Sequence, residues 1–192
     1  MRAGYPDPTS VLWQGRAPWG SMTVGRGTGL FGAVGCVVTS VAQARRILGE
    51  RAGATPLDVQ AAGLARDGVW APGASGAVVS ELVRAQGLDV GVDLDGPGRV
   101  AAPDVLRSAV IDCLLHGGVC LGAVDHDSAV KGGDPIADHW TCIYAVDDDN
   151  LWMADPATAR RERISFETLS GPVSWGRRRR DYRLVRVVTV FR

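Results

Sequence analysis

The sequence has no excess of charge of either sign and no long apolar run. Its 192 residues carry 21 basic and 21 acidic side chains, so the formal net charge is zero. A balanced charge gives no bulk attraction to nucleic acid or to an anionic membrane. No apolar stretch approaches the roughly 20 residues of a membrane-spanning helix, and Met1–Pro8 lacks the apolar core of a signal peptide. We therefore expect no nucleic-acid partner, no membrane span, and a cytoplasmic protein or one released by a non-classical route.

Cysteine is scarce, and the spacing and context of the cysteines argue against a metal site and against a disulfide framework. The chain has four cysteines, and no two form the CxxC pair typical of a metal site. Cys113, Cys120 and Cys142 lie in apolar runs, where a free cysteine behaves as a small hydrophobic residue. We predict no disulfide framework, no structural zinc and no cofactor. Cys36 has a different context, described below.

The length and composition are typical of one globular domain. Hydrophobic residues make up 46% of the chain and charged residues 22%, which is ordinary for such a domain. The chain is long enough to bury a sizeable core. We predict a single domain over residues 1–192. Within it, the Gly-, Pro- and Trp-rich residues 1–30 are expected to be irregular, and residues 1–12 to form a loose N-terminal segment.

Helical patterns come first along the chain and strand patterns follow. Apolar residues recur at helical spacing, with Thr55 as an N-cap, Pro56 at a first helical position, and Val105 on an apolar helix face. Later segments are short, apolar and β-branched, and one is apolar at nearly every position, as in a strand covered on both faces. This order, with hairpins between the strands, predicts an α+β fold with a mainly antiparallel sheet. The expected helices are 36–48, 55–66, 77–86 and 103–116, with one helical turn at 165–169, and the expected strands are 119–124, 139–146, 151–154 and 182–191.

Cys36 directly follows Gly35 and opens the apolar run Val37–Ala42. This pattern indicates a cysteine in the first turn of a buried helix. The positive end of the helix dipole favours a thiolate there, and the thiolate is the nucleophilic form of the side chain. A core cysteine that begins a buried helix gives the same pattern, so other residues must distinguish the two.

His139 begins one predicted strand, and Asp155 ends the next, before a proline. A thiol, an imidazole and a carboxylate in this order suit nucleophilic hydrolysis. The simpler alternatives are a buried histidine bonded to a backbone carbonyl and an aspartate in a turn. His139 and Asp155 face each other directly only if the hairpin is centred on Asp147, whereas the turn residues centre on Asp148–Asp149. We therefore expect an asymmetric loop or a β-bulge in this hairpin.

Four separated blocks of the sequence resemble the C39-like family of papain-fold cysteine peptidases, and together they span about residues 12–170. The resemblance lies in a Gln…Trp-Gly block, a Gly-Cys-x-x-Thr-Ser block, a histidine that opens a strand, and a strand that ends in Asp-Pro. These blocks are Gln14–Ser21, Gly35–Ser40, Asp138–Tyr144 and Leu151–Pro156.

The resemblance implies a papain-like fold and a role for four residues. Cys36 would attack a carbonyl carbon, and His139 would take its proton and later give one to the leaving amine. Asp155 would orient the imidazole, while the Gln14 side-chain amide and the Cys36 backbone N–H would stabilise the oxyanion. As a residue of an irregular segment, Gln14 also fits an ordinary surface position. The sequence departs from the family at Asp138, where glycine is usual, and a carboxylate there would raise the pKa of His139 or compete to orient it.

Three other polar groups have simple interpretations. The loop Asp125–Asp127, with His126 at its centre, is compatible with a metal, but such loops are usually solvated and we predict no metal site. His116 fits the C-terminus of a helix, where a cation is favoured. Arg177–Arg180 would suit an acidic partner, although a solvated surface turn is the simpler interpretation.

These observations predict a cysteine peptidase that cleaves a peptide or isopeptide bond of a peptide or protein substrate through an acyl-enzyme intermediate. Loops 15–33, 68–76 and 125–138 would line its groove. Two alternatives remain open. One is a hydrolase of peptidoglycan stem peptides, a lysin or effector, because the high Ala, Arg, Gly and Val content suits a bacterium or phage with a GC-rich genome. The other is a papain-like scaffold that has lost turnover and binds peptides.

Overall fold

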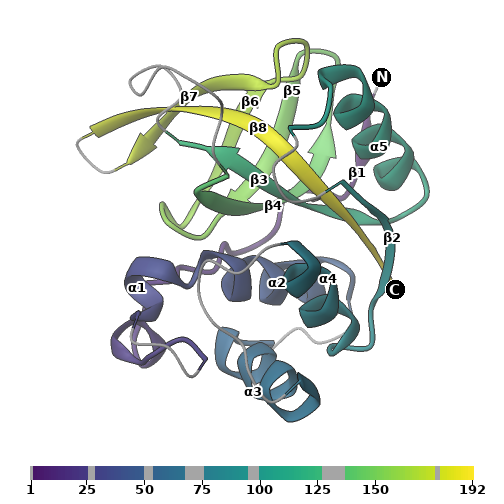
Figure 1. Cartoon of the computed structure of the whole chain (residues 1–192). Helices are drawn as coiled ribbons and strands as arrows, with labels where there is room; N and C mark the ends of the chain where they lie inside the picture. The colour runs from purple at the N-terminus through teal and green to yellow at the C-terminus, as the bar shows by residue number, and fades with distance from the viewer. Residues whose placement is uncertain are drawn as a thin grey trace.

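The computed structural model describes residues 2–25, 29–49, 54–67, 76–94, 100–126, 137–175 and 178–192. Within these residues the chain forms five α-helices, one short 3₁₀ helix and eight strands (Figure 1). Helices α1–α4 lie together on one side of the sheet, and α5 lies on the other side (Figure 1). The predicted α+β class is confirmed.

The four predicted helices are confirmed to within two residues at each end. Thr55 caps its helix as expected, because its hydroxyl accepts a hydrogen bond from the Asp58 N–H at 3.3 Å. Val105 was placed wrongly on the apolar face of the last helix, since its side chain is 47% exposed. The helices are η1 (Trp19–Ser21), α1 (Phe31–Val34), α2 (Cys36–Ile47), α3 (Pro56–Asp67), α4 (Gly76–Arg84) and α5 (Pro103–Leu115).

Every strand pair that the structure describes is antiparallel. The strand order is β2-β8-β3-β4-β5-β6, with β1 paired to β4 and β7 paired to β8. The strands are β1 (Ala3–Gly4), β2 (Asp89–Asp93), β3 (Val119–Asp125), β4 (His139–Val146), β5 (Asn150–Asp155), β6 (Arg160–Ser165), β7 (Ser170–Trp175) and β8 (Arg178–Phe191).

The helical turn expected at residues 165–169 is absent from this described segment. Ser165 instead ends β6, and a non-helical turn leads into β7. Leu169 has a φ of 52°, in the left-handed region that a right-handed helix does not use. The backbone therefore reverses here and forms a strand connection.

The N-terminal segment is bound to the sheet, which corrects the expectation of a loose segment over residues 1–12. Ala3 pairs with Val146 of β4, and Leu12 is buried and donates its N–H to the Gln43 side chain at 2.9 Å. Burial of these apolar residues offsets the entropy of ordering the segment.

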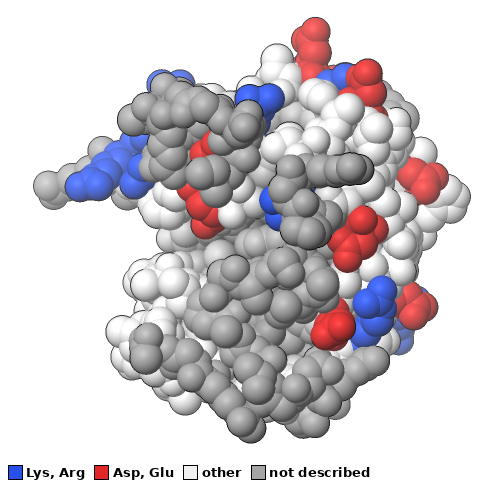
Figure 2. Space-filling model, in the orientation of Figure 1, with Lys and Arg blue, Asp and Glu red and all other residues white. Residues whose placement is uncertain are grey.

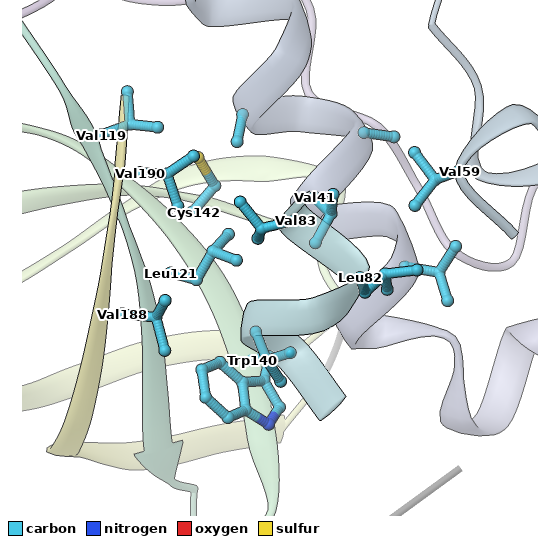
Figure 3. Packing of buried hydrophobic residues seen from close by; sticks show 14 of the residues in the cluster. Val41, Val59, Leu82, Val83, Val119, Leu121, Trp140, Cys142, Val188 and Val190 are labelled. Atoms are coloured by element: carbon cyan, nitrogen blue, oxygen red, sulfur yellow. The ribbon is translucent and has the colours of Figure 1, made fainter. Parts of the chain in front are cut away.

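The sheet is covered on both faces, as the apolar pattern of residues 139–146 predicted. On one face, Val41 and Val83 of the helices point toward Leu121 and Cys142 of the sheet (Figure 3). On the other face, α5 and the β7–β8 hairpin enclose a second core, which includes Val110, Cys113, Ile143, Met153, Val173, Tyr182 and Leu184. All eight residues of β4 are buried as a result.

The hairpin of β4 and β5 contains the predicted irregularity. Cys142 pairs with Ala154, but the register shifts by one residue between Ile143 and Ala145. Continued by one residue, this register places Asp155 opposite Thr141, two residues from His139 and on the same face of the sheet, whereas without the β-bulge Asp155 would lie opposite Cys142 on the other face. The two groups are therefore diagonal neighbours.

None of the helices in the described ranges combines the length and apolar character needed to cross a bilayer.

Candidate active site

Cys36 is the first residue of α2 and is half-buried. The helix begins after a tight connection in which Gly35 packs on α1. A Cβ at Gly35 would lie 2.6 Å from the carbonyl oxygen of Phe31, so only glycine fits. The first bond of the new helix runs from the Thr39 N–H to the Gly35 carbonyl at 3.0 Å. The N–H groups before it, including that of Cys36, point out of the helix mouth beside the thiol.

Packing of α2 on β4 brings the thiol to the start of that strand. Ser40 lies one helical turn after Cys36, and its buried hydroxyl donates to the Trp140 carbonyl at 3.1 Å. Since Trp140 follows His139 in β4, this bond aligns the helix mouth with the imidazole. The Cys36 thiol lies near enough to the His139 ring to raise the pKa of the imidazole.

Asp155 holds the other side of the imidazole. Its Oδ1 accepts a hydrogen bond from Nε2 of His139 at 2.8 Å and from the Ala157 N–H at 2.8 Å. Its Oδ2 accepts one from the Tyr182 hydroxyl at 2.6 Å. With Nε2 committed to Asp155, Nδ1 is the ring nitrogen left to meet Cys36. The structure thus brings together the three residues that the sequence singled out as a triad.

The carboxylate and the imidazole stabilise each other's charge. Burial of His139 works against the imidazolium, but the adjacent Asp155 carboxylate outweighs it and raises the pKa of His139 to about 10, with the nearby Cys36 acting in the same direction. Burial also disfavours the Asp155 carboxylate, yet His139, Tyr182 and the Ala157 N–H hold its pKa below the usual range. The site therefore favours a charged imidazolium at neutral pH.

Gln14 joins the two parts of the chain that carry the triad. Its backbone N–H donates to the Pro156 carbonyl at 2.9 Å, directly after Asp155. Its side-chain Nε2 donates to the Gly32 carbonyl in α1 at 3.1 Å. Gln14 is buried and is not a surface residue. The amide has a second N–H available for another acceptor.

Two aromatic residues that sequence reasoning missed complete the site. Trp175 meets the His139 ring edge-on at a centroid distance of 5.7 Å. Its indole N–H donates to the Tyr182 hydroxyl at 2.6 Å, and this hydroxyl in turn donates to Asp155. A buried tyrosine needs a polar partner, so the place of Tyr182 in an apolar strand was a signal that the sequence contained. The strand pattern could not identify that partner as Asp155.

Asp138, the departure from the family pattern, has a different partner from the one expected. Its carboxylate accepts a hydrogen bond from the His126 backbone N–H at 3.0 Å and lies against the His126 ring. His126 stacks on Trp175 at 5.4 Å. Asp155 is therefore the carboxylate that orients His139.

The loop expected to be polar and solvated is described only in part. Of the loops expected to line a groove, residues 26–28, 68–75 and 127–136 lie outside the described residues, and Asp127 is among them. Among the residues that the structure does describe, no group of three or more metal-ligating side chains occurs. His116 ends α5 and contacts Asp112 one turn earlier, as expected for a helix C-terminus.

The other three cysteines lie within the two cores. Cys113, Cys120 and Cys142 are buried, and none of the four thiols is in a disulfide. Burial raises the pKa of Cys120 and Cys142, so these groups stay neutral. Of the four thiols, only that of Cys36 is partly accessible and lies beside an imidazole whose pKa it raises.

Comparison with known proteins adds no assignment: no protein-family model matches the chain, and no curated protein matches it. The catalytic roles of Cys36, His139, Asp155 and Gln14 therefore stay predictions.

We expect Tyr182→Phe to destabilise the protein by about 1.5–3 kcal/mol, because it removes a hydrogen bond to a buried carboxylate. Tyr144→Phe is a matched control, since the Tyr144 hydroxyl also donates to an aspartate, Asp7, but that side chain is 51% exposed and regains water. Chemical unfolding of both variants measures the difference. Equal losses would show that Asp155 does not depend on Tyr182.

We expect Asp155→Asn to lower the pKa of His139 by about 1–3 pH units, because the opposing charge is lost while the burial remains. NMR titration of the His139 ring measures this. Asp147→Asn is the control, since Asp147 accepts its hydrogen bonds from Trp152 and nearby turn residues. An unchanged His139 titration in Asp155→Asn would contradict the electrostatic coupling described here.

Proposed function

We propose that the protein is a thiol-dependent hydrolase of papain-like fold, a cysteine peptidase that cleaves an amide bond. The observation that carries the proposal is the contact of the Cys36 thiol with an imidazole whose other nitrogen is bound to buried Asp155. Three chain segments far apart in sequence converge to form it. The resemblance to the C39-like family supports the same assignment.

The proposed reaction is acyl transfer in two steps. The Cys36 thiolate attacks the carbonyl carbon, a C–S bond forms, and the carbonyl electrons move to oxygen. His139 then gives its proton to the amine nitrogen, the C–N bond breaks, and an acyl-thioester remains. In the second step a water molecule gives a proton to His139 and attacks the thioester. The acid product leaves, and the thiolate and imidazolium return.

The surrounding residues would support each step. Asp155 keeps the imidazolium charged and oriented, and the dipole of α2 favours the thiolate. The Cys36 N–H at the helix mouth and the second N–H of Gln14 would hold the developing oxyanion. Gln14 is fixed for this by its bonds to Pro156 and Gly32.

Cys36→Ala is expected to abolish hydrolysis of a mixed pool of fluorogenic peptides at neutral pH. Cys120→Ala is the matched control, because it removes a thiol of raised pKa in the opposite core. Iodoacetamide followed by intact-mass measurement should modify the wild-type protein once, at Cys36, and should leave Cys36→Ala unmodified.

The outcomes separate the possible functions. Turnover that survives in Cys36→Ala would refute the proposal. Rapid alkylation of Cys36 without any turnover of peptides would favour the peptide-binding scaffold. Purified bacterial cell walls are a further substrate in the same assay. Release of stem peptides from the cell walls, without cleavage of the peptide pool, would identify a hydrolase of peptidoglycan stem peptides.

Gln14→Ala is expected to lower kcat by about 10²- to 10³-fold with little change in KM, because one oxyanion donor is lost only in the transition state. Gln43→Ala is the control, since this buried amide bonds to Leu12 and Ser10 of the N-terminal segment. Steady-state kinetics measure both. A Gln14 effect confined to KM would instead indicate a role in binding substrate.

A further inference from the structure

The β7–β8 hairpin projects from the rest of the sheet (Figure 1). Blue side chains mark its projecting edge, and the surface is hollowed between it and the helical half of the molecule (Figure 2). The sequence interpretation of Arg177–Arg180 as a surface turn is wrong, because Arg178–Arg180 pair with β7; Arg177 lies outside the described residues. Trp175 is the last residue of β7 and pairs with Arg178, so it lies in the projecting part of the hairpin.

Three contacts hold the indole of Trp175 in place. Its N–H donates to the Tyr182 hydroxyl at 2.6 Å, and the Arg180 guanidinium lies 5.4 Å from its ring centroid. The His126 ring stacks on it at a centroid distance of 5.4 Å, with 10° between the two planes. Tyr182 and Arg180 belong to the same hairpin, whereas His126 directly follows β3. The stack with His126 therefore joins the hairpin to the central sheet.

Asp138 fixes the position of His126 by two contacts. Its carboxylate accepts the His126 backbone N–H at 3.0 Å and lies against Nδ1 of the ring. Both side chains are only 19% exposed, and a hydrogen bond to a carboxylate is stronger in such a setting than in open water. Asp138 is in turn held on β3, because its own N–H donates to the Val124 carbonyl at 3.2 Å.

The indole lies beside the bond that orients the candidate catalytic imidazole. Its edge meets the His139 ring at a centroid distance of 5.7 Å, and His139 bonds to Asp155 at 2.8 Å. His139 is 4% exposed and Asp155 has no exposed surface. Water that reached this bond would compete for its donor and its acceptor and would weaken the attraction between the charges. A displacement of Trp175 would open one side of the bond to water.

We propose that His126 and Asp138 are positioning residues of the candidate site, which hold Trp175 against His139 and so keep water from the bond between His139 and Asp155. Both residues act through the indole and need no contact with the substrate. The inference rests on the proposed function for its meaning, because that bond orients the imidazole in the proposed reaction. It also gives a role to Asp138, at the position where the C39-like family usually has glycine.

Exchange of the His139 Nε2 proton with water, followed by NMR, tests the inference without any need for turnover. This proton lies in the bond to Asp155, so its exchange rate reports how often water reaches that bond. His126→Ala should raise the rate by about tenfold or more, because the stack that holds Trp175 is lost. His126→Phe keeps a flat ring against the indole and should keep the rate close to that of the wild type.

Two further variants make the test specific. Asp138→Ala should also raise the exchange rate, and the double variant His126→Ala/Asp138→Ala should raise it no further than His126→Ala, because both changes act through one ring. His116→Ala is the matched control, since His116 contacts an aspartate, Asp112, in a pair whose side chains are 70% and 72% exposed. This control should leave the rate unchanged.

Two results would overturn the inference. One is an unchanged exchange rate in His126→Ala, and the other is an equal rise in His126→Ala and His126→Phe. Circular dichroism identifies any variant that does not fold, and Asp138→Ala then decides.

The peptide assay separates this inference from the proposed function. His126→Ala should lower kcat by about tenfold with little change in KM, because the imidazole is less well oriented, and His126→Phe should restore most of the loss. An unchanged kcat in His126→Ala would overturn the inference and leave the hydrolase standing. Absence of turnover in the wild type, with proton exchange that depends on His126, would do the reverse.

Discussion

Asp155 is a carboxylate with no exposed surface, and three donors satisfy it: the His139 ring, the Tyr182 hydroxyl and the Ala157 N–H. A buried charge that lacks such partners is strongly destabilising. The fold therefore has to deliver two side chains from different strands and one turn to the same point. The bulge in the β4–β5 hairpin, the long strand β8 and the turn after Pro156 all meet this requirement.

The same constraint explains the arrangement around it. Because Nε2 of His139 is fixed on Asp155, the other edge of the ring is held toward α2, where the helix begins at Cys36. The helix is aligned there by the bond from Ser40 to Trp140. Electrostatics and packing thus agree: the core between α2 and the sheet positions the thiol, while the core beneath β7 and β8 positions the carboxylate.

Local chemistry was enough to predict much of this fold. Apolar spacing and the Thr55 cap located the four helices, and the apolar character of residues 139–146 identified a strand buried on both faces. Several of the errors came from contacts distant in sequence. Ala3 pairs with β4, Leu12 bonds to Gln43, and Val105 faces solvent because of where α5 docks. No local pattern contains that information.

The residues of the candidate site also fall into two groups: those that the sequence identified and those that only the fold brings to the site. Cys36, His139 and Asp155 stood out by their residue types and order, and Gln14 by its place in a block that resembles one family. Trp175 and Tyr182 belong to no such block, and their place beside His139 follows from the pairing of β7 with β8. Asp138 was expected to act on His139, but its partner, His126, could be identified only in three dimensions.

The strand β8 runs from Arg178 to Phe191 and belongs to both halves of the molecule. Its first half supports Asp155 through Tyr182, and its second half supplies Val188 and Val190 to the core under the helices. An opening that frees the carboxylate must therefore disturb the central ladder between β3 and β8 as well. Because β8 pairs with β3 from Arg183 to Val190, the strand segment next to Tyr182 is held by the central sheet, and the side chains around Asp155 are held with it.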